Sequence, residues 1–233
     1  VGAVIVLGNL KHVTPSEAVA RPMRFCLWVL IILMVARVGH WGELGWVFSL
    51  VTQATAAFIP LSGLLIAEVL LRRHAPPVLK WFCGVGAAVF LVLAMLSTGQ
   101  FGYWQMLGLL SFQVIGLAGI AFFIATRDRA SLAFAENQAI ERISLAFVLI
   151  MPFVVSDFLR TPNIDTPVRL GGLAVLALCW LLINFQRSGL RRADIVRGCS
   201  AVFGIGVVLT ILMAIAVPLD WRSGAQITSV LLA

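Results

Sequence analysis

The chain has 233 residues, of which 61% are hydrophobic and 12% are charged. Soluble domains contain about half and about a quarter of such residues, and too few charges are present here to cover a water-exposed surface. The composition therefore excludes an ordinary soluble fold and indicates that lipid surrounds most of the molecule. The net charge is +7, and in a membrane protein the location of the basic residues matters more than their total.

Seven apolar runs approach the length needed to cross a hydrocarbon core of about 30 Å. A run of this length in lipid must satisfy its backbone hydrogen bonds internally, which predicts α-helices. We therefore expect an all-α, polytopic transmembrane helical bundle with seven full helices. A partial helix at 1–10 precedes them, and the stretch after Ser223 has the character of the start of another. The seven runs cover residues 23–39, 46–71, 79–97, 104–126, 143–159, 168–186 and 199–217.

The ends of the sequence suggest a piece of something longer. It opens directly on the apolar stretch Val1 to Leu10 and closes on a second apolar stretch, Ile227 to Ala233. No signal peptide is recognisable, and no loop is long enough to hold a soluble domain. We expect one integral membrane domain over residues 1–233, truncated at one or both ends.

The basic residues agree with this helix count. The connections near 11–24, 72–80, 127–142 and 187–197 hold all but four of the 17 Lys and Arg residues, the exceptions being Arg37, Arg160, Arg169 and Arg222. By the positive-inside rule these four connections are cytoplasmic. Aromatic rings favour the headgroup level, and the predicted outer ends hold Trp41, Trp46, Tyr103 and Trp104. The pattern predicts a multi-pass protein of the bacterial inner membrane, in contact with membrane lipids.

Charged residues inside the apolar runs are few, and each has two interpretations. Glu68 stands one helical turn before Arg72, which favours an i,i+4 ion pair near the cytoplasmic interface over a proton or cation site. Asp157 and Arg160 lie at the outer end of another helix. They form either a solvated rim or part of a cluster that receives a ligand.

Prolines and uncharged polar groups mark a second kind of candidate site. Pro60 and Pro152 fall near the middle of two helices, where a proline removes a hydrogen bond and kinks the helix. Gln113 belongs to the polar groups within the runs, which either join helices by hydrogen bonds or line a small polar pocket. The candidate ligand-binding residues are therefore Pro60, Glu68, Gln113, Pro152, Asp157 and Arg160.

Searches for cofactor and catalytic motifs are negative. The four cysteines have no C-x-x-C spacing, so neither a disulfide framework nor a zinc site is expected. The three histidines lie at segment ends, unsuited to haem between helices, and both lysines are interfacial, which excludes retinal. No phosphate loop, metalloprotease or nucleophile-elbow motif occurs. We expect no catalytic residue, no metal, no cofactor and no contact with nucleic acid.

The order of features points to one class of membrane module. An initial segment ends in Asn9-Leu10-Lys11-His12, and Ala20-Arg21-Pro22 leads into the next helix. A proline-bearing helix closes with Leu70-Leu71-Arg72-Arg73-His74 before Ala75-Pro76-Pro77, and Ile150-Met151-Pro152 to Leu159 precedes a short loop and Val168-Arg169-Leu170-Gly171-Gly172. Over residues 1–187 this order resembles the membrane-embedded N-terminal module of bacterial AraC-type transcription regulators and of seven-helix sensor histidine kinases. The helix at 199–217 departs from it, because such a sensor is expected to return to the cytoplasm and continue into an effector domain.

The resemblance implies a non-enzymatic sensory or signal-transduction module. It would bind a lipid or small apolar ligand and act on a cytoplasmic effector domain or partner protein. The residues leave two alternatives open. Proline-kinked helices also suit a small secondary transporter or flippase-like protein, with Glu68 and Asp157 as coupling groups. The third hypothesis is an accessory subunit of a larger membrane complex.

Overall fold

The computed structural model describes residues 17–41 and 44–127 of the chain, together with isolated positions outside these ranges. The chain divides into two compact units, one of residues 14–137 and one of residues 1–13 and 138–233. Nearly all described residues belong to the first unit. The single membrane domain expected over residues 1–233 stays a prediction.

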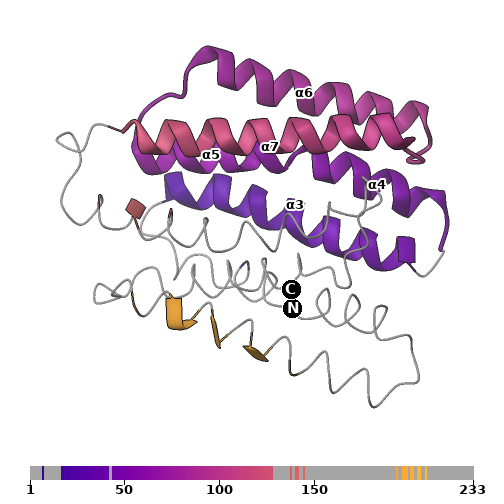
Figure 1. Cartoon of the computed structure of the whole chain (residues 1–233), viewed down its shortest axis with the longest axis horizontal. Helices are drawn as coiled ribbons and strands as arrows, with labels where there is room; N and C mark the ends of the chain where they lie inside the picture. Colours follow the sequence, from indigo (N-terminus) through magenta and orange to yellow (C-terminus); the bar gives the residue numbers. More distant parts are fainter. Residues whose placement is uncertain are drawn as a thin grey trace. The chain divides into compact units, whose positions relative to one another are not determined.

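In the described part of the first unit the structure has five helices (Figure 1): α3 Glu17–Trp41, α4 Trp46–Ala57, α5 Ile59–Leu71, α6 Pro77–Leu96 and α7 Tyr103–Ala125. No strand occurs among the described residues. Within the same residues, four segments are long and apolar enough to cross a membrane, with α4 and α5 together making one of them: Ala20–His40, Trp46–Leu71, Pro77–Leu96 and Tyr103–Ala125. These four confirm the runs expected at 23–39, 46–71, 79–97 and 104–126. The remaining expected helices lie outside the described residues, apart from isolated positions.

The connection between α5 and α6 is short. The helix α5 ends at Leu71 because Arg72 adopts the left-handed conformation, with φ of 49°. The helix α6 begins after Pro76 with Pro77 in its first turn, where the missing N–H is not needed for an intrahelical bond. The chain therefore reverses within five residues, and the first turn of α6 returns beside the last turn of α5.

The connection between α6 and α7 is held against α4. Thr98 and Gly99 both have positive φ, at 50° and 75°, and together they reverse the chain. A Cβ on Gly99 would overlap the backbone of Leu50, so only glycine fits this close approach. Ser49 lies beside it and donates a buried hydrogen bond from Oγ to the Gly99 carbonyl at 2.7 Å. This hydrogen bond connects the turn between α6 and α7 to α4.

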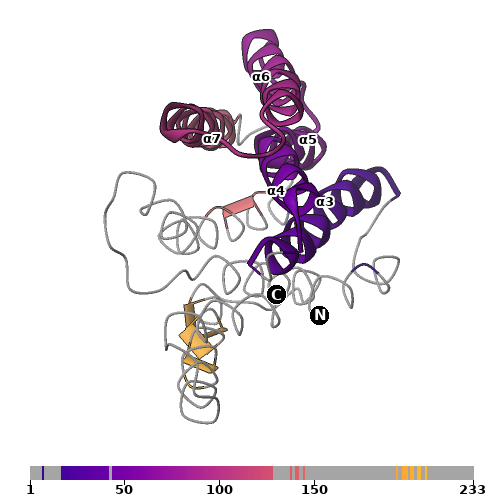
Figure 2. The same ribbon diagram turned by 90° about the vertical axis from the view of Figure 1, so that its right-hand side faces the viewer.

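The α4–α5 span occupies the middle of the unit (Figure 2). On one side α3 packs against both α4 and α5, and on the other α6 packs against α4 while α7 packs against α5. The helices α6 and α7 also pack against each other. The α4–α5 span therefore contacts each of the other described helices of the unit.

Glycine makes close contact possible between α6 and α7. The Phe112 ring of α7 lies beside Phe82 and Phe90 of α6, with ring centroids 5.3 and 5.4 Å apart. A Cβ on Gly86 would overlap that ring. Small residues that admit a neighbouring helix are the usual packing device in membranes, so this contact supports the bundle expected from the sequence.

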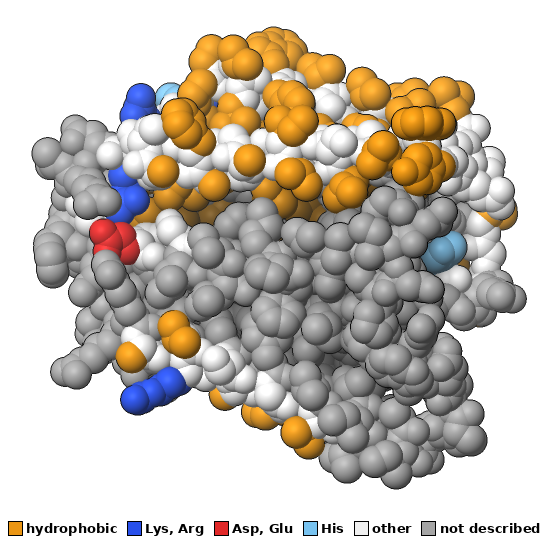
Figure 3. All heavy atoms as spheres, viewed as in Figure 1, with side chains coloured by type: hydrophobic (Ala, Val, Ile, Leu, Met, Phe, Trp, Pro, Cys, Tyr) orange, Lys and Arg blue, Asp and Glu red, His pale blue; other side chains and the backbone are white. Residues whose placement is uncertain are grey.

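The two ends of the unit differ in chemistry. Basic residues gather where α3 begins, α5 ends, α6 begins and α7 ends, at the left in Figure 3, and include Arg24, Arg73 and Lys80. The opposite end carries exposed Trp46 and Trp104. This arrangement agrees with the alternation of basic connections along the sequence.

Candidate functional site

The α4–α5 span is broken at Phe58, inside the membrane-crossing segment. The amide of Phe58 bonds to the Thr55 carbonyl at 3.0 Å, an i to i−3 bond in place of the α-helical one. Pro60 follows at the start of α5 and has no N–H. The carbonyl four residues before it, on Ala56, therefore loses its regular helical donor. The sequence-based prediction that Pro60 interrupts this helix is confirmed.

A side chain from another helix occupies this break. Gln113 of α7 is only 2% exposed, and its Nε2 donates a 2.7 Å hydrogen bond to the Ala56 carbonyl. Turning the amide over would set two oxygen acceptors against each other, so the Nε2 assignment follows from the partner. The residue thus joins α7 to the broken span, as the interhelical interpretation of the polar groups predicted.

The other end of the Gln113 amide is unsatisfied. Its Oε1 is fully buried and has no hydrogen-bond partner among the described residues. Leaving a buried acceptor unpaired costs about 1–3 kcal/mol. We call Ala56, Phe58, Pro60 and Gln113 together the proline junction. It is a buried polar spot, and among the described residues its Gln113 Oε1 is an acceptor without a partner.

Close packing fixes the distance between α5 and α7 at the proline junction. A Cβ placed on Gly116, one helical turn after Gln113, would lie 2.9 Å from Pro60 Cβ and 3.4 Å from Pro60 Cγ. The pyrrolidine ring is attached to the backbone at both ends and has little freedom to move. Gly116 therefore lets α7 approach near enough for the Gln113 amide to reach the freed carbonyl.

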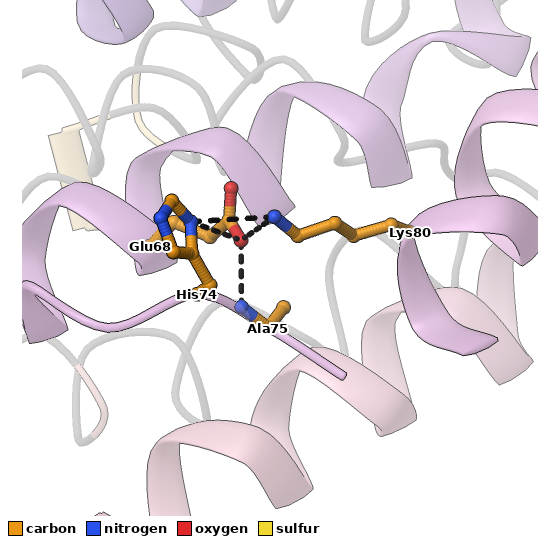
Figure 4. A network of polar contacts seen from close by, with 4 residues as sticks. All are labelled: Glu68, His74, Ala75 and Lys80. Carbon is orange, nitrogen blue, oxygen red and sulfur yellow. Dashed lines mark hydrogen bonds and ion pairs between the residues drawn. The ribbon is translucent and has the colours of Figure 1, made fainter. Parts of the chain in front are cut away.

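Glu68 occupies a second polar site, near the C-terminal end of α5 (Figure 4). Its Oε1 lies 2.7 Å from Lys80 Nζ and 3.8 Å from His74 Nδ1, and it accepts a hydrogen bond from the Ala75 amide at 2.6 Å. The His74 ring nitrogen also lies 3.4 Å from Lys80 Nζ. Glu68, His74, Ala75 and Lys80 are hereafter the α5–α6 clasp.

The clasp changes the interpretation of Glu68. The sequence suggested Arg72 as its partner, but Arg72 is the left-handed residue at which α5 ends, and the ammonium on the carboxylate is that of Lys80. With 17% of its side chain exposed, Glu68 is compensated by an ion pair and a backbone N–H. A partnered carboxylate of this kind is more typical of a structural contact than of a proton-transfer site.

Some of the predicted site residues lie together in the structure, and others are not among the described residues. Pro60 and Gln113 meet at the proline junction, while Glu68 belongs to the separate clasp. Pro152, Asp157 and Arg160 lie outside the described residues. No group of three metal-ligating side chains occurs among the residues that the structure describes.

The sequence analysis did not assign a site role to Ala56 or to Lys80. Ala56 has no polar side chain, but its role could have been found, because the carbonyl four residues before a helical proline is always freed. Lys80 was assigned to the interface, and no local signal indicated that the turn after α5 would bring it back to Glu68. Family models, curated proteins and solved structures were compared with the chain, and none matches it.

Proposed function

We propose that the chain is a membrane-embedded sensory or signal-transduction module, non-enzymatic in itself, that perceives a lipid or small apolar ligand. The free acceptor of Gln113 at the proline junction is the observation that carries this proposal. A ligand with an apolar body and one hydroxyl group would pair with that oxygen and offset the cost of burying it. No net charge is needed on such a ligand.

The position of the junction supports a switching role. It joins two helical segments that meet at Phe58, and the Gln113–Ala56 hydrogen bond together with the packing of Gly116 on Pro60 connects them to α7. A hydroxyl that donates to Gln113 Oε1 leaves the Nε2–Ala56 bond in place, and the ligand would favour the arrangement of α4, α5 and α7 in which its apolar body fits beside this amide. Such a change counts as signalling only if the ligand binds one arrangement better than the other. The far end of α5 carries the clasp, so its movement would reach the α5–α6 connection.

The transporter alternative receives less support from the contacts. It assigns Glu68 to ion coupling, and that carboxylate already has Lys80 and the Ala75 amide as partners. Asp157, its other coupling group, lies outside the described residues. The resemblance to sensor modules also favours the sensory proposal, with a cytoplasmic effector domain or partner protein as its output.

A photoreactive alcohol tests the proposal. The full chain in lipid nanodiscs would be irradiated with diazirine-bearing decanol, with and without excess unlabelled decanol, and labelled peptides identified by mass spectrometry. We expect saturable labelling around Phe58 and Gln113, and its loss in Gln113→Leu. Gln53→Leu, a matched change on α4 away from the break, should label normally.

Two outcomes would contradict the sensory proposal. One is labelling that does not saturate and spreads over the exposed apolar faces, as for bulk lipid. The other is equal saturable labelling in Gln113→Leu and the unchanged chain. Because Gln113→Leu also removes a buried hydrogen bond, its thermal unfolding must be recorded in parallel. Gln113→Met, which keeps length without an acceptor, provides a second variant.

We further infer that the end of the unit bearing Arg73 and Lys80 faces the cytoplasm of a bacterial cell. The excess of basic residues at this end supports the orientation, because cytoplasmic connections retain Lys and Arg. The exposed Trp46 and Trp104 rings at the other end are suited to the outer headgroup level. Reporter fusions at the two ends test this orientation.

A further inference from the structure

The outer face of α6 is a continuous apolar stripe. Its exposed side chains are Val78, Trp81, Val85, Val89 and Val92, at spacings of three or four residues that place them on one helix face. From Val78 to Val92 the stripe is about 21 Å long at 1.5 Å per residue. This helix is also the least covered of the four spans, with 17% of its apolar window buried.

The stripe begins at a basic turn. Between Glu68 and Lys80 the chain carries one acid, three permanent cations and one histidine, and Lys80 is bound to the acid. Because Lys80 balances the charge of Glu68, Arg73 contributes positive charge at this turn. Arg73 is exposed, and the His74 side chain is 93% exposed although its ring lies 3.4 Å from Lys80 Nζ. Both residues lie within four positions of Pro77, where α6 begins, and the partial positive charge of that helix N-terminus has the same sign.

Trp81 lies where the basic turn meets the stripe. It is 71% exposed and sits one helical turn after Val78, which is 79% exposed. Indole rings favour the boundary between headgroups and hydrocarbon, so Trp81 indicates the depth at which this boundary crosses α6. The exposed Arg73 lies before that level in the chain, and the exposed aliphatic side chains Val85, Val89 and Val92 lie after it. An anionic amphiphile has the complementary distribution of charge and apolar surface.

We propose that this face of α6 binds an anionic phospholipid. The headgroup phosphate pairs with Arg73 and His74, and an acyl chain lies along Trp81, Val85 and Val89. Charge complementarity at one end of the stripe selects a lipid over an uncharged partner helix, which would leave the basic turn without a counter-charge. The surface is separate from the proline junction, so the proposal stands whether or not Gln113 binds an alcohol.

Lipid competition measured by native mass spectrometry tests the proposal. The purified full chain would be incubated with equal amounts of dioleoyl phosphatidylglycerol and dioleoyl phosphatidylcholine, and the ratio of the two retained lipids recorded. A basic side chain near an anionic surface contributes about 1 kcal/mol, equivalent to about a five-fold change in affinity. We expect the preference for phosphatidylglycerol to fall about five-fold or more in Arg73→Gln/His74→Gln.

Matched variants at the opposite end of the unit are the controls. His40→Gln removes an exposed histidine and Trp104→Ala removes an exposed tryptophan, and both should leave the lipid ratio unchanged. Trp81→Ala should reduce retention of both lipids, because it removes apolar contact instead of charge. Thermal unfolding without added lipid checks that every variant is folded.

The proposal is overturned if Arg73→Gln/His74→Gln retains the preference, or if His40→Gln lowers it equally. The first result would show that this turn does not recognise the headgroup, and the second that loss of an exposed histidine at the opposite end has the same effect. Copurification of a protein that covers α6 and displaces phosphatidylglycerol would overturn it as well. None of these outcomes bears on labelling by decanol at Gln113, so the two proposals fail independently.

Discussion

Gly116→Ala should destabilise the bundle, although alanine is the better helix former. The new Cβ would lie 2.9 Å from Pro60 Cβ, and the ring offers no flexible end that could move away. Overpacking of this kind lowers the free energy of unfolding by about 1–3 kcal/mol. Replacing a helical glycine by alanine raises it by up to about 1 kcal/mol. We expect a net loss of about 1–2 kcal/mol. For a chain of this size that corresponds to a fall of about 2–8 °C in Tm.

Gly84→Ala is the matched control, because a Cβ at Gly84 of α6 would have no neighbour within 4 Å. The assay is thermal unfolding in detergent followed by circular dichroism, repeated as titration with sodium dodecyl sulfate to avoid reliance on an irreversible scan. Gly84→Ala should be neutral or stabilising. Equal stability of the two variants would refute the close contact between α7 and Pro60, and with it the packing that holds Gln113 at the junction.

The clasp should show energetic coupling between its charges. In a double-mutant cycle of Glu68→Gln and Lys80→Met, we expect a coupling free energy of about 1 kcal/mol. This value is near the upper end for exposed ion pairs, because Lys80 is 40% exposed while Glu68 is largely buried. Additive effects of the two substitutions on the free energy of unfolding would contradict the contact. The orientation of the unit should appear in reporter fusions. Green fluorescent protein fused after Arg73 should fluoresce and alkaline phosphatase fused after Gln100 should be active, and the reverse pattern would invert the proposed topology.

The spans of the first unit could be predicted from sequence because their causes are local. An apolar run of about 20 residues must form a helix in lipid, and the Ala75-Pro76-Pro77 stretch marks the connection between two such runs by its own backbone preferences. The break at Pro60 follows in the same way from a missing N–H. The freed Ala56 carbonyl is likewise determined by counting four residues back from Pro60.

The partners of these groups depend on contacts between residues far apart in the chain. Gln113 lies 57 residues from Ala56, and several polar residues in the apolar runs could have supplied the donor to the Ala56 carbonyl. The packing of Gly116 on Pro60 brings Gln113 close enough to be that donor. For Glu68, sequence spacing favoured Arg72, but α5 ends there and the following turn returns Lys80 to the carboxylate. The sequence by itself determined where the helices run and which backbone group loses its donor. Only the tertiary structure decided which side chain donates a hydrogen bond to the freed Ala56 carbonyl, because packing sets the distance between the helices.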